Sequence, residues 1–116
     1  MYKAAVEERP DRYKVSVDQF RTYHEQGYVV VPGLVEPAQI AELKSHAMDI
    51  FSGKVSLEGV EPPAQDESPA QIQQRLTRIH MLHRRDEPNE RFMLHPRLLD
   101  VVEVLVGPDV LCLQTM

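Results

Sequence analysis

The chain alternates segments of helical apolar periodicity with short β-branched runs. The first apolar stripe follows Ser16, a good N-cap, and ends at Gly27, so the pattern predicts a helix over residues 17–26. A second helix is predicted over residues 36–51, where apolar side chains recur on one face. Between the two helices, the run Tyr-Val-Val-Val at 28–31 precedes Pro-Gly, which is typical of a buried strand and a turn.

The C-terminal stretch predicts a helix, a stop and a strand. Pro96 fits a first helical turn, apolar spacing continues to residue 106, and Gly107 with Pro108 ends the helix. Residues 110–116 then favour a strand. A strand needs a sheet to pair with, and this chain supplies few other candidates. We therefore expect the sequence to be the opening part of a larger domain.

The remaining segments carry weaker patterns. Residues 1–15 are charged and are predicted to be a flexible leader, and 54–71 is predicted to be a mobile loop because it is rich in Gly, Pro and acids. The segment 76–82 fits either an alternating strand or the tail of a helix that starts at Pro69, and we prefer the strand. Residues 86–94 predict a short helix.

Composition excludes several classes of protein. The 116 residues allow one domain at most, and a formal charge of -5 is opposite to the clustered Lys and Arg that nucleic-acid binding requires. A single cysteine, Cys112, cannot form an intrachain disulfide or a cysteine-based zinc site. The charged N-terminus has no apolar run, so we expect a cytoplasmic protein without membrane or nucleic-acid partners.

The five histidines are candidate metal ligands. His80, His83 and Asp86 form the tightest group, but the adjacent arginines at 84 and 85 would place two cations beside a bound metal ion. We therefore predict no metal site, with His80 and His83 either at the surface or satisfied by hydrogen bonds, His24 and His46 on helix surfaces and His95 in a loop before proline.

Arg78 has two interpretations. Its flanking residues, Thr77 and Ile79, belong to the predicted strand 76–82. If Arg78 points inward, its guanidinium needs a carboxylate or phosphate partner, and otherwise it faces solvent. The residues alone leave these alternatives open.

Two motifs resemble the N-terminal part of the phytanoyl-CoA dioxygenase family. One runs from Phe20 through Gly27 to Leu34, and the other runs from Leu94 through Gly107 to Met116. The resemblance implies an α+β fold in residues 16–116, namely N-terminal helices plus the first strands of a double-stranded β-helix (jelly roll), incomplete in this chain. It also implies a non-haem iron(II) and 2-oxoglutarate-dependent dioxygenase that hydroxylates a small organic substrate.

The same resemblance places three residues at the 2-oxoglutarate site. Arg78 and Met116 would contact 2-oxoglutarate, and Gln114 would line the same site, although some relatives have lysine at the position of Arg78. The family's iron ligands include a His-x-Asp pair, and no His-x-Asp occurs in this sequence. We therefore assign no catalytic or metal residue and expect neither iron nor 2-oxoglutarate to bind this chain alone. Activity would require the remainder of the catalytic domain.

A different class of function is also consistent with the sequence. The chain could be a small helix-rich interaction module in which residues 94–116 pair with a partner's sheet edge by strand addition. In either case the predicted strands lack neighbours, so we expect the isolated chain to be aggregation-prone or partly molten.

Overall fold

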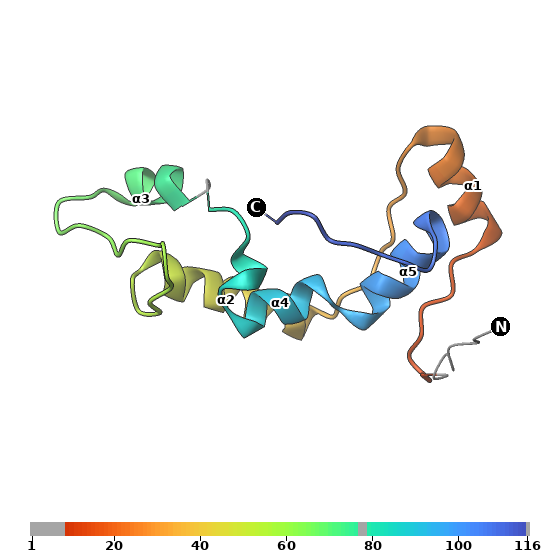
Figure 1. Ribbon diagram of the computed structural model, residues 1–116, viewed down its shortest axis with the longest axis horizontal. Helices are drawn as coiled ribbons and strands as arrows, with labels where there is room; N and C mark the ends of the chain where they lie inside the picture. The colour runs from red at the N-terminus through yellow and green to blue at the C-terminus, as the bar shows by residue number, and fades with distance from the viewer. Residues whose placement is uncertain (1–8, 77–78, 116) are drawn as a thin grey trace. The chain divides into compact units, whose positions relative to one another are not determined.

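The computed structural model describes residues 9–76 and 79–115, which divide into two compact units. Unit 1 contains the described residues up to 34 together with 96–110, and unit 2 contains those of 35–95 together with 111–115. The elements follow one another along the chain as α1 (Val17–Gln26), α2 (Pro37–Phe51), α3 (Pro69–Leu76), the 3₁₀ turn η1 (Leu82–Arg84), α4 (Glu87–Met93) and α5 (Pro96–Val106) (Figure 1).

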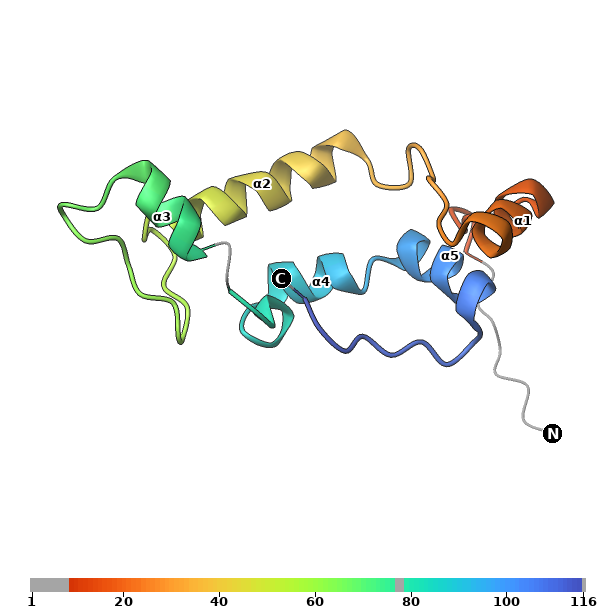
Figure 2. The ribbon, with the colours of Figure 1, turned by 90° about the horizontal axis from the view of Figure 1, so that it is seen from above.

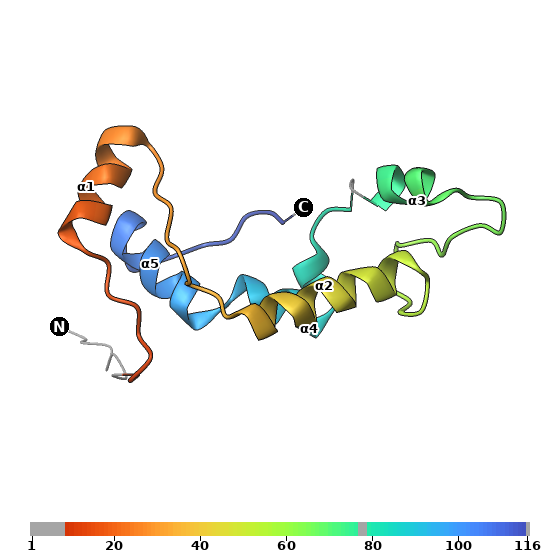
Figure 3. The same cartoon turned by 180° about the vertical axis from the view of Figure 1, so that it is seen from behind.

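In unit 1, α1 packs against α5 (Figure 3). Reciprocal capping starts α1, because Ser16 Oγ accepts the Gln19 N–H at 3.1 Å and Gln19 Oε1 accepts the Ser16 N–H at 2.9 Å. Gly27, with φ of +81°, ends the helix in the left-handed conformation. These bounds confirm the predicted helix at 17–26.

The segment before α1 is attached to α5 through Asp100. The Asp100 carboxylate is buried and accepts hydrogen bonds from Arg9 Nη2 and, at 3.0 Å, from the Tyr13 N–H. Its helical neighbour Val101 is also buried. A buried carboxylate is tolerated here because several donors replace the water that it loses.

In unit 2, α2 lies beside α4 (Figure 2). Arg91 of α4 forms an ion pair with Glu42 of α2. α3 contacts α2, and the buried apolar side chains of this unit are Ile50 and Leu57 among the residues described. Two further pairs, described below, join α2 to the residue before α4 and to His95, two positions after the end of α4.

The predicted β structure is wrong throughout the described ranges. Residues 28–31 and 110–115 form no strand, and no sheet is present there, which overturns the α+β class with the first strands of a jelly roll. The β-branched run is covered only in part, because Tyr28 and Val30 are 64% and 72% exposed while Val29 and Val31 are half-buried. A strand also requires a ladder of backbone hydrogen bonds to a neighbour.

The predicted strand at 76–82 is corrected in the same way. Residue 76 ends α3, residues 77 and 78 lie outside the described ranges, and Leu82 begins η1. A helix does start at Pro69, as the alternative expected, and it takes the last residues of the loop predicted at 54–71. Because this helix ends at Leu76, residues 79–82 are not its tail.

The other helix predictions hold. The segments predicted at 36–51, at 86–94 and from Pro96 to residue 106 appear as α2, α4 and α5. In the part of the chain that the structure describes, no helix combines the length and apolar character needed to cross a bilayer.

Candidate functional site

Of the three predicted 2-oxoglutarate residues, Gln114 alone lies within the described ranges. Its Nε2 donates to His80 Nδ1 over 2.9 Å, and its side chain is exposed. Arg78 and Met116 lie outside the described residues. Their roles stay predictions.

The segment that contains Gln114 is nevertheless held against residues 80–83. The Met81 N–H donates to the Thr115 carbonyl oxygen at 2.8 Å. Met81 adopts φ of +62°, a left-handed conformation that costs a non-glycine residue energy. Such a conformation persists only where surrounding contacts enforce it. We call the contacts between residues 80–83 and 114–115 the clamp.

His83 forms the buried part of the clamp. Its side chain lies in η1, and Nδ1 is 2.7 Å from Thr115 Oγ1. The residue is 9% exposed, so of the two predicted alternatives His83 is the histidine satisfied by a hydrogen bond and not the surface one. Together, one backbone hydrogen bond and two side-chain hydrogen bonds hold residues 80–83 beside residues 114–115.

A second polar pair joins α2 to α4. His46 Nε2 donates to Asp86 Oδ2 at 2.5 Å, with 18% and 11% of the two side chains exposed, so His46 is not the helix-surface residue that was predicted. Burial, the largest single influence, raises the pKa of Asp86, but hydrogen bonds from Asn89 and His46 outweigh burial and leave that pKa below its usual value. Asp86 is therefore held as a carboxylate.

His95, predicted to lie in a loop, is buried and also contacts α2. Gln39 Oε1 accepts the Glu36 N–H at 3.1 Å and lies 3.1 Å from His95 Nε2. Because that amide oxygen can only accept, His95 Nε2 is the donor of this bond. His95 Nδ1 is buried without a hydrogen-bond partner. The pair ties the end of the α4 segment to the start of α2.

The described residues do not fit an iron site. A metal ion in a two-histidine, one-carboxylate site needs three such groups converging, and no group of three His, Cys, Asp or Glu side chains converges among them. His80, His83 and Asp86 bond instead to Gln114, Thr115 and His46. We therefore assign no iron ligand among the described residues.

Sequence reasoning missed the partners of the three histidines. His83 and Thr115 are 32 positions apart, and His46 and Asp86 are 40 apart. No local spacing connects such residues. The usable signal was the apolar neighbours of each histidine, which indicate partial burial without naming the partner.

Comparison with known proteins adds one match. A family model described as phytanoyl-CoA dioxygenase (PhyH) matches residues 23–116. The matched span contains the clamp and all three residues predicted to bind 2-oxoglutarate. No curated protein and no solved structure gives a significant match.

Proposed function

Because this chain belongs to the phytanoyl-CoA dioxygenase family, we propose that it forms part of an iron(II)- and 2-oxoglutarate-dependent oxygenase that hydroxylates a small organic substrate. The observation that carries this proposal is the family match across residues 23–116. Iron, when bound, would supply the oxygen chemistry. Since the described residues do not fit an iron site, we assign this chain a binding role and no metal-dependent step.

In this proposal Arg78 binds a carboxylate of 2-oxoglutarate. A guanidinium presents parallel N–H donors that match the two oxygens of a carboxylate, and such charge-assisted pairs are stronger than neutral hydrogen bonds. Gln114 and Met116 line the same site. The clamp supports this proposal, because it joins Met81 and His83, which follow Arg78 in the sequence, to Thr115, which precedes Met116.

We further propose that the 116 residues do not turn over substrate by themselves. The sequence contains no His-x-Asp pair, which the family uses to hold iron. The iron ligands would therefore come from other residues of the catalytic domain.

The test is the dependence of activity on 2-oxoglutarate in an active enzyme that contains this chain. Arg78→Ala should raise the KM for 2-oxoglutarate by about tenfold or more, since a hydrogen bond to a charged group contributes about 1.5–3 kcal/mol. Arg78→Lys should have a smaller effect, because it keeps the charge and loses the paired donors.

Arg84→Ala is the matched control, because Arg84 is an exposed arginine six residues away. It should leave the KM for 2-oxoglutarate unchanged. An unchanged KM in Arg78→Ala would remove Arg78 from the site and leave the proposal without its main binding residue.

A further inference from the structure

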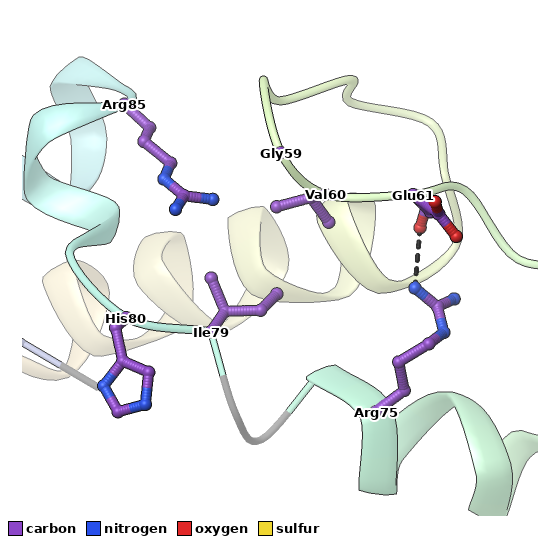
Figure 4. A pocket seen from close by; sticks show the side chains of 7 residues that line it. All are labelled: Gly59, Val60, Glu61, Arg75, Ile79, His80 and Arg85. Atoms are coloured by element: carbon purple, nitrogen blue, oxygen red, sulfur yellow. Dashed lines mark hydrogen bonds between the residues drawn. The ribbon is translucent and has the colours of Figure 1, made fainter.

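A cavity of about 420 Å³ lies in unit 2 (Figure 4). Its walls are the loop 59–61, the C-terminal part of α3 and side chains of the segment 79–85. This volume is in the range of small-molecule sites. The polar groups on its walls determine which ligand it can accept.

Arg85 contributes a positioned cation to the cavity. Its Nη1 donates to the Glu58 carbonyl oxygen at 3.1 Å, and Figure 4 shows the guanidinium reaching toward Val60. The guanidinium also lies against Gly59, where an added Cβ would come within 3.0 Å of Nη1. A backbone carbonyl and a glycine thus hold the group in place.

No carboxylate among the described residues pairs with Arg85. A carbonyl oxygen satisfies one N–H of a guanidinium but leaves its positive charge without a counter-ion. The other N–H donors of Arg85 remain available for an anion. A planar, always-charged fork of this kind matches carboxylate and phosphate oxygens.

The second arginine of the wall has a different role. Arg75 donates to both carboxylate oxygens of Glu67, at 2.8 and 3.0 Å, and to the Glu61 carbonyl oxygen at 2.8 Å. The hydrogen bond from Arg75 lowers the pKa of Glu67, and the bond to Glu67 raises the pKa of Arg75. The charge of Arg75 is therefore balanced, and its contacts fix the wall.

His80 also lines the cavity. Its Nδ1 accepts from Gln114 Nε2, so the ring carries its proton on Nε2 when neutral. Glu61 is the one acidic residue on the described walls, and its charge acts on Arg75. Arg85 is therefore the cation on these walls whose charge has no carboxylate partner among the described residues, and the His80 ring points away from its guanidinium (Figure 4).

We propose that this cavity binds the carboxylate or phosphate group of a small ligand, with Arg85 as the main contact. The proposal stands on these contacts and does not depend on the oxygenase function. If the oxygenase proposal is also correct, the ligand would be a substrate with an acidic group.

The test is an NMR titration of the ¹⁵N-labelled chain at constant ionic strength and at a temperature below the onset of thermal unfolding, with inorganic phosphate and succinate as separate probes. We expect saturable shifts of the Arg85 side-chain N–H signal. Arg85→Ala should weaken binding by about tenfold or more, as expected for loss of charged hydrogen bonds. Tighter binding of phosphate would assign a phosphorylated ligand, and tighter binding of succinate would assign a carboxylic acid.

Two variants make the test specific. Arg84→Ala removes an exposed neighbouring arginine that does not line this cavity, so it should bind both probes like the parent chain. Arg85→Lys keeps the charge and should fall between the parent and Arg85→Ala. The proposal is overturned if neither probe gives saturable shifts, or if Arg84→Ala and Arg85→Ala weaken binding equally.

Failure of this site would be distinguishable from failure of the oxygenase proposal. The Arg85 variants report on anion binding by the chain alone, whereas the Arg78 variants report on the KM for 2-oxoglutarate in an active enzyme. Either result can be positive while the other is negative.

Discussion

At the scale of single residues, Asp86 binds different partners through its two carboxylate oxygens. Oδ1 accepts the Asn89 backbone N–H at 3.1 Å and so caps α4, while Oδ2 accepts from His46 of α2. The side chain is 11% exposed, so the charge is well shielded from water. One carboxylate therefore starts α4 and attaches it to α2. The sequence predicts the helix start at residue 86, but no local pattern indicates the contact with α2.

This arrangement predicts acid sensitivity of α4. The pKa of Asp86 in the folded chain is below the unfolded value of about 3.9, so the carboxylate stabilises the fold fully above that value. The stabilisation is lost as the pH falls through the lowered folded pKa. We expect helical chemical shifts of α4 to decrease below about pH 4, and Asp86→Asn to remove this step.

Neutral-pH variants separate the two roles of Asp86. Asp86→Ala should reduce the local stability of α4 by about 1 kcal/mol, measured by amide hydrogen exchange, because the cap is lost. His46→Gln keeps a donor near Asp86 and should leave the cap intact. An acid step that persists unchanged in Asp86→Asn would contradict the assignment.

At the scale of elements, the helices and the extended segments behaved differently. α1, α2, α4 and α5 formed where caps, prolines and apolar spacing predicted them. The segment 111–115 stays extended but is joined to residues 80–83 by the clamp rather than by a ladder. Its conformation depends on His83 and Thr115, which are distant in sequence.

The clamp gives a prediction at this scale. Thr115→Val keeps the side-chain shape and removes the hydroxyl, leaving buried His83 Nδ1 without its partner. An unpaired buried polar group costs about 1–3 kcal/mol, so the Met81 amide, which donates to the Thr115 carbonyl, should exchange with solvent roughly 5- to 150-fold faster. Hydrogen exchange followed by NMR measures this directly.

Gln114→Ala is the control, because it removes the exposed bond to His80 and leaves the buried pair intact. Its effect on Met81 exchange should be much smaller. Equal protection in Thr115→Val and the parent chain would show that the clamp does not hold this segment.

At the scale of the whole molecule, little apolar surface is buried among the described residues. The buried hydrophobic side chains there are Ile50, Leu57 and Val101, while Leu111 and Leu113 are more than 80% exposed. Large exposed apolar side chains indicate surfaces that a partner or further protein would cover. Each unit thus has a small core.

We expect the isolated chain to bind the dye ANS and to unfold over a broad temperature range without a cooperative transition. Circular dichroism and calorimetry measure the transition, and sedimentation velocity measures the oligomeric state. A sharp cooperative transition in a monomer would contradict this expectation. A stable oligomer would instead favour the interaction-module alternative, with Leu111 and Leu113 at the interface.

The sequence by itself determined what local physics controls. Ser16 and Gly27 bound α1, and Pro96 with Gly107 bound α5, because capping and backbone conformation depend on residues within a few positions. Two motifs also sufficed to identify the family, which the match over residues 23–116 confirms. The residues proposed to bind 2-oxoglutarate follow from that resemblance alone.

Only the tertiary structure decided which segments pair and which polar groups are buried. The β-branched run at 28–31 and the segment at 110–115 had strand composition, yet a strand forms only where a neighbour supplies its hydrogen bonds. The sequence predicts His46 on a helix surface and leaves His83 either at the surface or hydrogen-bonded, whereas partners 40 and 32 positions away leave His46 half-buried and His83 buried. Such contacts depend on how the chain folds back on itself, which the spacing of nearby residues does not encode.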